Sequence, residues 1–167
     1  MIIRIVIFCF IVITTKMMFV LFFQTEDKKL SMMKEASDFI EFLRIYSCMM
    51  KMSFEEILSS YTFKFDNVKN VFNKLLDDLK SGLINAKSFD NFAYEQIGSA
   101  SEFNLKINRL TEFYGSSMSD VLDNKLSLLK SEIDKYIGEY EHEYKERKKL
   151  FNKLSFLIGC LIAIVLI

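Results

Sequence analysis

The two apolar ends of this chain, residues 1–23 and 150–167, constrain its fold more than any other feature. The polar residues of the first end are Arg4, Thr14, Thr15 and Lys16. Residues 1–23 are long enough to cross a bilayer, because about twenty helical residues span the hydrocarbon core. A mid-bilayer lysine costs about 3 kcal/mol, and each Ile, Leu, Phe or Val recovers about 0.3–0.6 kcal/mol. The sum favours insertion, and Lys16 lies off-centre, where its side chain is expected to snorkel.

Two other interpretations of the first end compete with an uncleaved anchor. A signal peptide would use Arg4 as its charged start and residues 5–12 as its apolar core. However, no small-x-small cleavage site follows, and the apolar run resumes after Lys16. A lipoprotein anchor at Cys9 would need a small residue at the position that Phe8 occupies. We therefore expect residues 1–23 to remain as a transmembrane anchor.

The second apolar end is shorter than the first. Leu154–Ile167 has no charged side chain, and it would reach only about 21 Å of a core that is about 30 Å thick. Leu150 and Phe151 extend this reach to about 27 Å, with Lys153 snorkelling outward. The alternative, a core helix, would require more burial than the rest of the chain can provide. We expect residues 150–167 to form a second transmembrane segment.

Basic residues cluster beside the second end, and we call them the basic collar: Lys145, Arg147, Lys148, Lys149 and Lys153. Three more follow the first end: Lys28, Lys29 and Lys34. Because positive residues near a membrane segment stay on the cytosolic side, the intervening domain is expected in the cytosol and both termini outside. The basic collar is also expected to attract anionic lipid, at about 1 kcal/mol per residue.

The composition of the intervening domain, residues 24–149, favours an all-α fold. The whole chain has no proline and only 5 glycines, and sheets depend on turns that use these residues. The formal net charge is zero, and no basic recognition helix is present, so nucleic acid is not an expected partner.

Spacing and capping signals predict a series of helices in this domain. The first helix is expected to continue beyond the anchor because apolar or small residues recur at steps of three and four: Leu30, Met33, Ser37, Ile40, Leu43, Ser47 and Met50. Ser53 and Glu56 form a capping-box pattern. Further helices are expected over residues 53–60, from Asp66 or Lys64 to Ser81, and over 90–97 and 102–114, with a stop at Gly115-Ser116-Ser117.

The last predicted helix runs from about Ser119 into the second apolar end. Its apolar seam, a candidate surface for packing against a partner, is Leu122, Leu126, Leu129, Ile133, Tyr136 and Tyr140. The same heptad spacing continues through Glu143, Arg147, Phe151 and Leu154. A heptad seam indicates either a coiled coil with another chain or packing on the preceding helices of this chain, and both alternatives stay open.

No residue pattern points to catalysis or to a cofactor. His142 is the only histidine and stands among glutamates, as on a solvated helix face. The cysteines Cys9, Cys48 and Cys160 have neither the spacing of a zinc site nor that of a disulfide framework. No phosphate loop, nucleophile elbow or HExxH motif is present. We expect a non-enzyme without metal, cofactor or small-molecule substrate.

The layout of the chain resembles the stage III sporulation protein AB family of endospore-forming Firmicutes. That family has a charged helix, a lysine and a Gly-Phe-Leu-x-Gly-like start to its apolar tail. Here Lys153 is followed by Ser155, in place of the first glycine, and then by Phe156, Leu157 and Gly159. Two more segments resemble the family: Leu110, Phe113 and Gly115 before the last helix, and Met52-Ser53-Phe54-Glu55-Glu56, which lacks the family's proline.

This resemblance implies a helical bundle similar to the cytoplasmic domain of the F-type platform proteins of type II secretion. It also implies a non-catalytic role in the transenvelope complex that joins the mother cell to the forespore. The bundle would act as an assembly platform at the mother-cell membrane, binding other proteins of the complex or a secretion-type ATPase. The alternative is a membrane-tethered binding or sensor module unrelated to sporulation.

Overall fold

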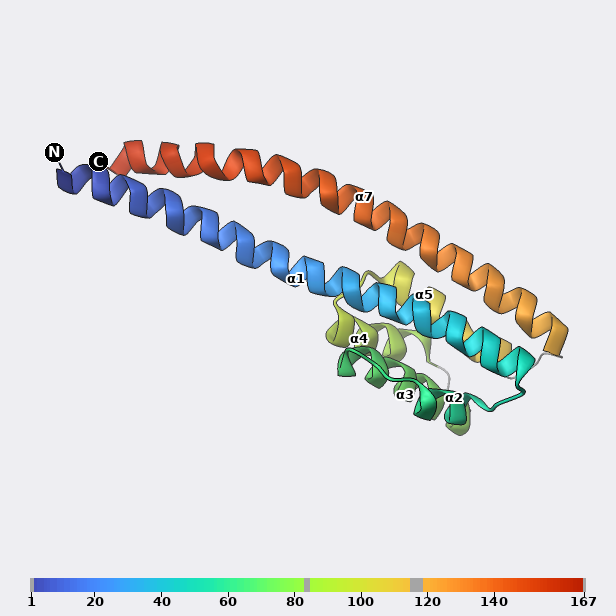
Figure 1. The fold of residues 1–167 in the computed structure, drawn as a ribbon. Coiled ribbons are helices and arrows are strands. Elements are labelled where there is room, and N and C mark those ends of the chain that lie inside the picture. The colour runs from blue at the N-terminus through green and yellow to red at the C-terminus, as the bar shows by residue number, and fades with distance from the viewer. Residues whose placement is uncertain (1, 83–84, 115–118, 167) are drawn as a thin grey trace. The chain divides into compact units, whose positions relative to one another are not determined.

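Two long helices run through most of the chain in a computed structural model that describes residues 2–82, 85–114 and 119–166. These are α1 (Ile2–Met49) and α7 (Ser119–Leu166), each of 48 residues (Figure 1). The prediction that each apolar end continues into a long helix is therefore confirmed. The predicted stop at Gly115-Ser116-Ser117 lies outside the described residues.

The chain divides into two compact units, and α1 and α7 each contribute to both. The terminal unit consists of Met1–Lys28 and Glu139–Ile167. The second unit, which we call the helical body, is Lys29–Gly138. Every described element is a helix, which confirms the all-α prediction. The two apolar ends, expected as separate segments at 1–23 and 150–167, thus belong to one unit.

The short helices of the body begin and end largely where the sequence places them. They are α2 (Phe54–Ser60), α3 (Asp66–Ser81), α4 (Ala86–Ile97), α5 (Ser101–Asn108) and α6 (Leu110–Tyr114). The capping box of α2 is present in full, because Ser53 accepts from the Glu56 N–H while the Glu56 carboxylate accepts from the Ser53 N–H. Gly82 ends α3 with a left-handed backbone, φ +66°, a conformation that favours glycine.

Two boundaries differ from the prediction. Helix α4 begins at Ala86, before the expected residue 90, because the Asn85 side chain accepts from the N–H groups of Lys87 and Ser88 and so caps the helix. The single helix expected over 102–114 is divided at Arg109 into α5 and α6. Its apolar residues, however, are buried as predicted: Phe103, Ile107, Leu110 and Phe113.

An aromatic cluster around Phe39 of α1 forms the centre of the body. Phe39 is fully buried, and its ring centroid lies 4.4 Å from that of Phe72 in α3. The Tyr61 and Phe63 rings, from the α2–α3 connection, lie 5.1 and 5.0 Å away. Rings at such separations add attraction beyond the area that they bury. The cluster therefore holds α1 against the α2–α3 segment.

Polar groups inside the body find partners in the chain itself. The buried Glu35 carboxylate of α1 accepts from the backbone N–H groups of Lys64 and Phe65, at the start of α3. The buried Asn104 of α5 donates to Asp90 of α4 at 2.8 Å and accepts from the Ser99 hydroxyl at 2.5 Å. A buried polar group without such a partner would be destabilising, so these bonds fix how the helices meet.

The buried face of α7 departs from the predicted heptad after Ile133. The face comprises Leu122, Leu126, Leu129, Ile133, Ile137, Tyr140, Tyr144, Lys148, Phe151 and Ser155, all but Phe151 buried or half-buried. Steps of four, three and four residues recur along it, which is the eleven-residue repeat of a helix with about 3.67 residues per turn. Glu143, Arg147 and Leu154, which the heptad placed on this face, are exposed, so that part of the prediction is wrong.

The seam residues that lie in the body are covered by their own chain. Leu126, Leu129 and Ile133 are fully buried, whereas Leu122 and Tyr136 are half-buried. The Tyr136 ring lies 5.8 Å from that of Phe103 in α5. These contacts agree with the intrachain alternative for the seam. On α1 the predicted stripe is buried from Leu30 to Leu43, but its last member, Met50, is exposed because the helix ends at Met49.

Replacing Phe39 by alanine is expected to destabilise the body by about 3–5 kcal/mol, because it removes a fully buried ring and leaves a cavity. The measurement is denaturant unfolding of the full chain in mild detergent. Met49→Ala is the control on the same helix, since this side chain is 80% exposed, and it should change stability by less than about 0.5 kcal/mol. Equal effects of the two variants would contradict the assignment of Phe39 to the core.

Candidate membrane-anchoring site

The first half of α1 and the second half of α7 lie side by side and antiparallel in the terminal unit. The ring of Phe19 lies 5.8 Å from that of Phe151. The Phe23 ring lies 6.0 Å from Phe151 and 5.9 Å from Tyr144. Because larger numbers on α1 meet smaller numbers on α7, the two helices run in opposite directions. The apolar ends of the chain therefore pack on each other.

A polar cluster joins the two helices where their apolar segments end. The Lys148 ammonium donates to Asp27 at 2.8 Å, and the Tyr144 hydroxyl donates to the same carboxylate at 2.5 Å. One helical turn away, the Tyr140 hydroxyl donates to Glu26. The Lys148 ammonium also lies 5.2 Å from the centroid of the Tyr144 ring. We call Glu26, Asp27, Tyr140, Tyr144 and Lys148 the polar clasp.

The clasp shifts the pKa values of Asp27 and Lys148 toward the ionised forms. Partial burial acts to raise the pKa of Asp27, but the hydrogen bonds from Lys148 and Tyr144 outweigh it and hold the pKa below 3.8. The hydrogen bond to Asp27 is the main cause of the raised pKa of Lys148. Both groups are therefore charged at neutral pH. The centre of the clasp is an ion pair between Asp27 and Lys148, and the Tyr144 hydroxyl donates a hydrogen bond to the same Asp27 carboxylate.

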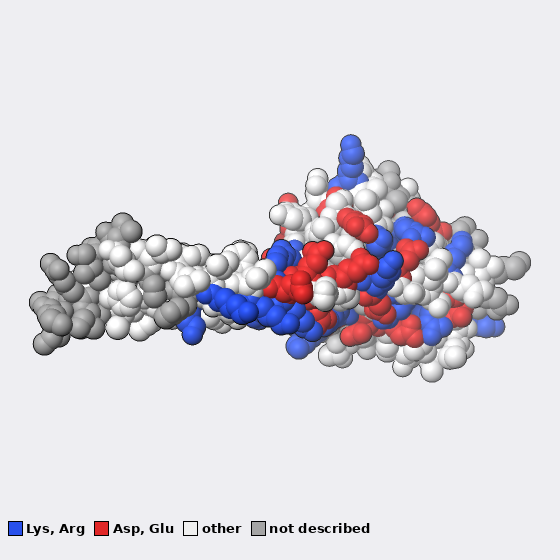
Figure 2. All heavy atoms as spheres, turned by 90° about the horizontal axis from the view of Figure 1, so that it is seen from above, with Lys and Arg blue, Asp and Glu red and all other residues white. Residues whose placement is uncertain are grey.

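The basic collar is divided between paired and free cations. Lys148 belongs to the clasp, and Lys145 pairs with Glu141 at 2.7 Å. Arg147, Lys149 and Lys153 are exposed and form no ion pair with the part of the chain that the structure describes. Figure 2 shows Lys and Arg side chains gathered beside a stretch in which most of the described residues are uncharged. A cationic band next to an apolar segment suits a surface of anionic lipid headgroups.

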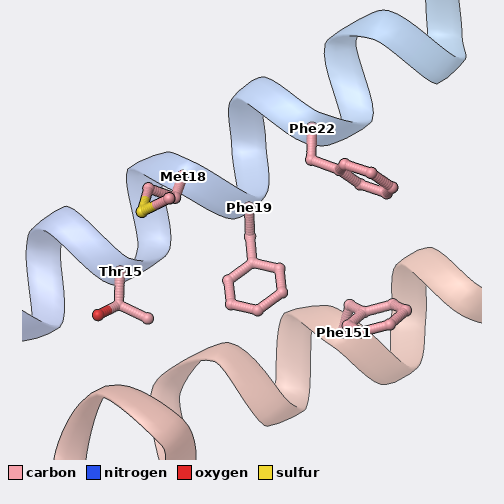
Figure 3. Close-up of a pocket in the computed structure, with 5 residues that line it drawn as sticks. All are labelled: Thr15, Met18, Phe19, Phe22 and Phe151. Carbon is pink, nitrogen blue, oxygen red and sulfur yellow. The ribbon is translucent and has the colours of Figure 1, made fainter. Parts of the chain in front are cut away.

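The apolar segments expose many of their side chains. On α1 the exposed fractions reach 67% at Phe10 and 74% at Met18, and on α7 Leu161 is 63% exposed. A hollow of about 330 Å³ lies between the two helices, lined by Thr15, Met18, Phe19, Phe22 and Phe151 (Figure 3). Water is a poor solvent for such a surface, whereas lipid chains would solvate it.

Helix α1 is the one helix in the described part of the chain that is long and apolar enough to cross a membrane. A signal sequence near an N-terminus passes the same criterion of length and composition. The predicted second segment, 150–167, is helical as far as Leu166. Its crossing of a membrane stays a prediction, because Phe156, Gly159, Cys160 and several later side chains lie outside the described residues.

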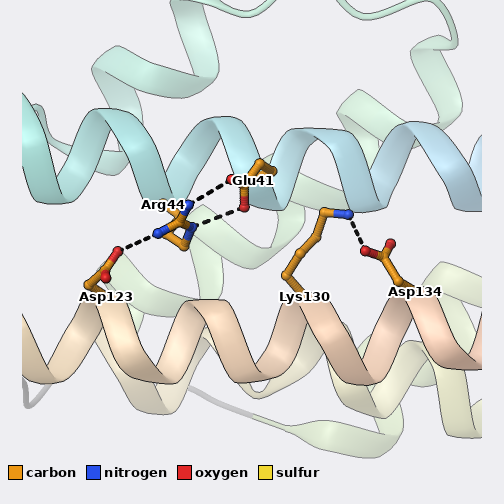
Figure 4. Close-up of polar contacts among 5 residues, drawn as sticks. All are labelled: Glu41, Arg44, Asp123, Lys130 and Asp134. Carbon is orange, nitrogen blue, oxygen red and sulfur yellow. Dashed lines mark hydrogen bonds and ion pairs between the residues drawn. The ribbon is translucent and has the colours of Figure 1, made fainter.

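Polar contacts in the body pair α1 with α7 without forming a reactive group. Arg44 donates to Asp123 of α7 and to Glu41 of its own helix, at 2.8 Å in each case (Figure 4). Asp134 accepts from the Ser37 hydroxyl at 2.6 Å and from Lys130 at 2.5 Å. Sequence reasoning missed the Arg44–Asp123 and Ser37–Asp134 pairs because their partners are 79 and 97 positions apart in the chain, and the spacing of charges within a single helix gives no signal for them.

The candidates for chemistry in the sequence are not brought together. The His142 side chain is 77% exposed, and its Nε2 lies 4.0 Å from the Glu146 carboxylate. No group of three or more His, Cys, Asp and Glu side chains with the geometry of a metal site occurs among the described residues. Cys9 is exposed and Cys48 half-buried, and neither forms a disulfide bond with another described residue.

Replacing Asp27 by asparagine is expected to destabilise the terminal unit near pH 7 by about 0.5–1 kcal/mol, since the ion pair is partly exposed. The folded pKa of Asp27 lies below its ordinary 3.8. The stabilisation is therefore present above that pH and is lost as the pH falls through the folded pKa. Titration from mild detergent into sodium dodecyl sulfate, followed by circular dichroism, measures the difference.

Two lysines of the collar provide the matched controls for this prediction. Lys148→Met should destabilise the unit as Asp27→Asn does, whereas Lys149→Met should leave stability unchanged, because Lys149 is exposed and outside the clasp. If the wild type and Asp27→Asn differ by the same amount at pH 7 and well below pH 3.8, the ion pair does not carry the effect.

A family model described as stage III sporulation protein AB matches residues 4–167, nearly the whole chain. No curated protein and no solved structure matches the chain. The match includes the charged helix, Lys153 and the apolar tail after it, which are the features that resemble the family most. The chain thus belongs to the stage III sporulation protein AB family and has a role in sporulation.

Proposed function

We propose that this protein is a non-catalytic membrane component of the transenvelope complex between mother cell and forespore, and that it serves as an assembly platform. The observation that carries the proposal is the course of α1 and α7. Each continues without interruption from the helical body into the apolar terminal unit. In a chain built in this way, the apolar ends of the two helices would insert into the membrane and hold the folded body at the membrane surface.

The charges support a position in the mother-cell membrane with the body in the cytosol. The exposed cations Arg147, Lys149 and Lys153 stand directly before or within the last apolar segment. Translocating such a group is costly, so basic residues near short segments remain on the cytosolic side. Both chain termini would then face away from the mother-cell cytosol.

The body is the part that we expect to bind partners. We infer a bundle similar to the cytoplasmic domain of F-type platform proteins of type II secretion, which makes sibling proteins of the complex or a secretion-type ATPase the expected partners. Support comes from apolar side chains that the body leaves in contact with water. On α7, Val121 and Leu128 are 48% and 58% exposed and lie two helical turns apart on one face.

A scaffold role also agrees with the chemistry of the described residues. The hollow of about 420 Å³ in the body is lined by Ser31, Lys34, Glu35, Asp38, Tyr61, Thr62, Lys64 and Phe65. Glu35 there is already bonded to two backbone N–H groups, and the lining contains neither histidine nor cysteine. The lining therefore offers neither a Ser–His nor a Cys–His pair, two common arrangements for covalent catalysis. A sensor module unrelated to sporulation is disfavoured by the family match.

The platform proposal is tested by isolating the tagged full chain from sporulating cells in mild detergent. We expect the other envelope-complex proteins to be isolated with it. Leu128→Glu should reduce their recovery by about tenfold, which corresponds to about 1.4 kcal/mol of binding free energy. Lys69→Glu, a charge change at another exposed position of the body, is the control and should not change recovery.

Two outcomes decide the matter. If wild-type chain sediments with the membrane yet carries none of these proteins, the platform role is wrong. If Leu128→Glu retains them while circular dichroism shows unchanged helix content, the α7 face is not the binding surface.

A further inference from the structure

We propose that the face of α1 around Lys16 binds a transmembrane helix of a different membrane protein, one that places an aspartate or glutamate opposite Lys16. This inference rests on the membrane position proposed above. It concerns a partner within the membrane, whereas the platform proposal concerns partners of the helical body. The argument depends on the charge of Lys16, on its depth in the apolar segment and on the shape of the surrounding surface.

Lys16 has no counter-charge within the apolar segments. The sequence has no Asp or Glu before Glu26 or after Glu146. Glu26 and Asp27, about 15 Å further along the helix, are bonded to Tyr140 and Lys148 in the polar clasp. The neighbouring hydroxyls are also occupied, since Thr14 and Thr15 donate to backbone carbonyls of their own helix. An ionisable residue in such a segment is rare and usually has a partner.

The position of Lys16 makes escape to the headgroups difficult. The cytosolic end of the apolar segment lies at Gln24, eight residues toward the C-terminus, or about 12 Å along the axis. Side chains on a helix lean toward its N-terminus, so Lys16 leans away from the nearer boundary and toward the membrane interior. The snorkelling that the sequence alone suggested would require the side chain to run against this direction.

The surface around Lys16 is a shallow groove along one face of α1. Its volume is about 360 Å³, and its lining residues are Ile13, Lys16, Met17, Val20, Leu21 and Gln24. Every lining residue comes from α1, and Met17 and Leu21 are 60% and 59% exposed. The spacing of three and four residues matches the ridge of a second helix. This groove is separate from the hollow between α1 and α7, which is lined by Phe19 and Phe151.

Charge complementarity selects the occupant of the groove. A second copy of this chain, inserted in the same direction, would bring one Lys16 toward another at equal depth, which is repulsive. Lipid chains would cover the apolar side chains but would leave the ammonium unpaired. A helix with a carboxylate at this depth satisfies the charge and the apolar lining together, as ionisable residues inside membranes commonly do.

The test uses photo-crosslinking in intact sporulating cells, with the full chain carrying a photoreactive amino acid in place of Met17. We expect a crosslink to an integral membrane protein that has an aspartate or glutamate within a transmembrane helix. Adding Lys16→Leu should reduce the product by about tenfold, whereas Lys16→Arg should retain it because the charge remains. A crosslinker in place of Met18, which is 74% exposed on another face, is the control and should not give this product.

The outcomes separate this inference from the membrane proposal. Extraction of the membrane fraction with alkaline carbonate shows first whether the chain is integral, and release into the soluble fraction would overturn both proposals. If the chain stays in the membrane but Met17 crosslinks only to lipid or to its own copies, the inference about Lys16 is wrong. It is also wrong if the captured helix has no carboxylate, or if Lys16→Leu leaves the yield unchanged.

Discussion

The packing of α1 on α7 is the interaction on which the rest of this protein depends. In the terminal unit the contacts are aromatic, between Phe19, Phe23 and Phe151, and end at the ion pair of Asp27 with Lys148. In the body the same two helices are joined by the hydrogen bond from Ser37 to Asp134 and by the ion pair of Arg44 with Asp123. A single apolar helix end would expose nearly all of its apolar side chains. Pairing the two ends reduces the apolar surface that water or lipid must cover.

The eleven-residue repeat of α7 explains how one helix serves two environments. A heptad seam would have turned Glu143 and Arg147 inward and left Tyr144 and Lys148 outside. The observed repeat places Tyr144 and Lys148 on the buried face, where they bind Asp27, and leaves Arg147 and Lys149 in the solvent. One periodicity therefore supplies both the bonds that close the helix pair and the free cations suited to a lipid surface.

Much of the fold can be predicted from local signals, and the remainder depends on contacts that local signals do not encode. Apolar spacing predicts α1, α3 and α7, and the Ser53–Glu56 box predicts α2. The heptad prediction failed at Glu143, Arg147 and Leu154, which are exposed, because the spacing of apolar residues over one or two turns does not distinguish a seven-residue repeat from an eleven-residue repeat. The clasp could not be predicted, because Asp27 and Lys148 are 121 positions apart, although Lys148 belongs to the basic collar that the sequence marks.

The central claim, that the apolar segments of α1 and α7 pair within one molecule, is tested most directly by crosslinking Phe19→Cys to Phe151→Cys. The experiment uses a full chain without native cysteines, a short bifunctional thiol reagent and native membranes. Because the ring centroids are 5.8 Å apart, the account predicts an intramolecular crosslink in the monomer, with none for Met17→Cys and Phe151→Cys. A crosslink between two molecules, or equal yields for both pairs, would contradict it.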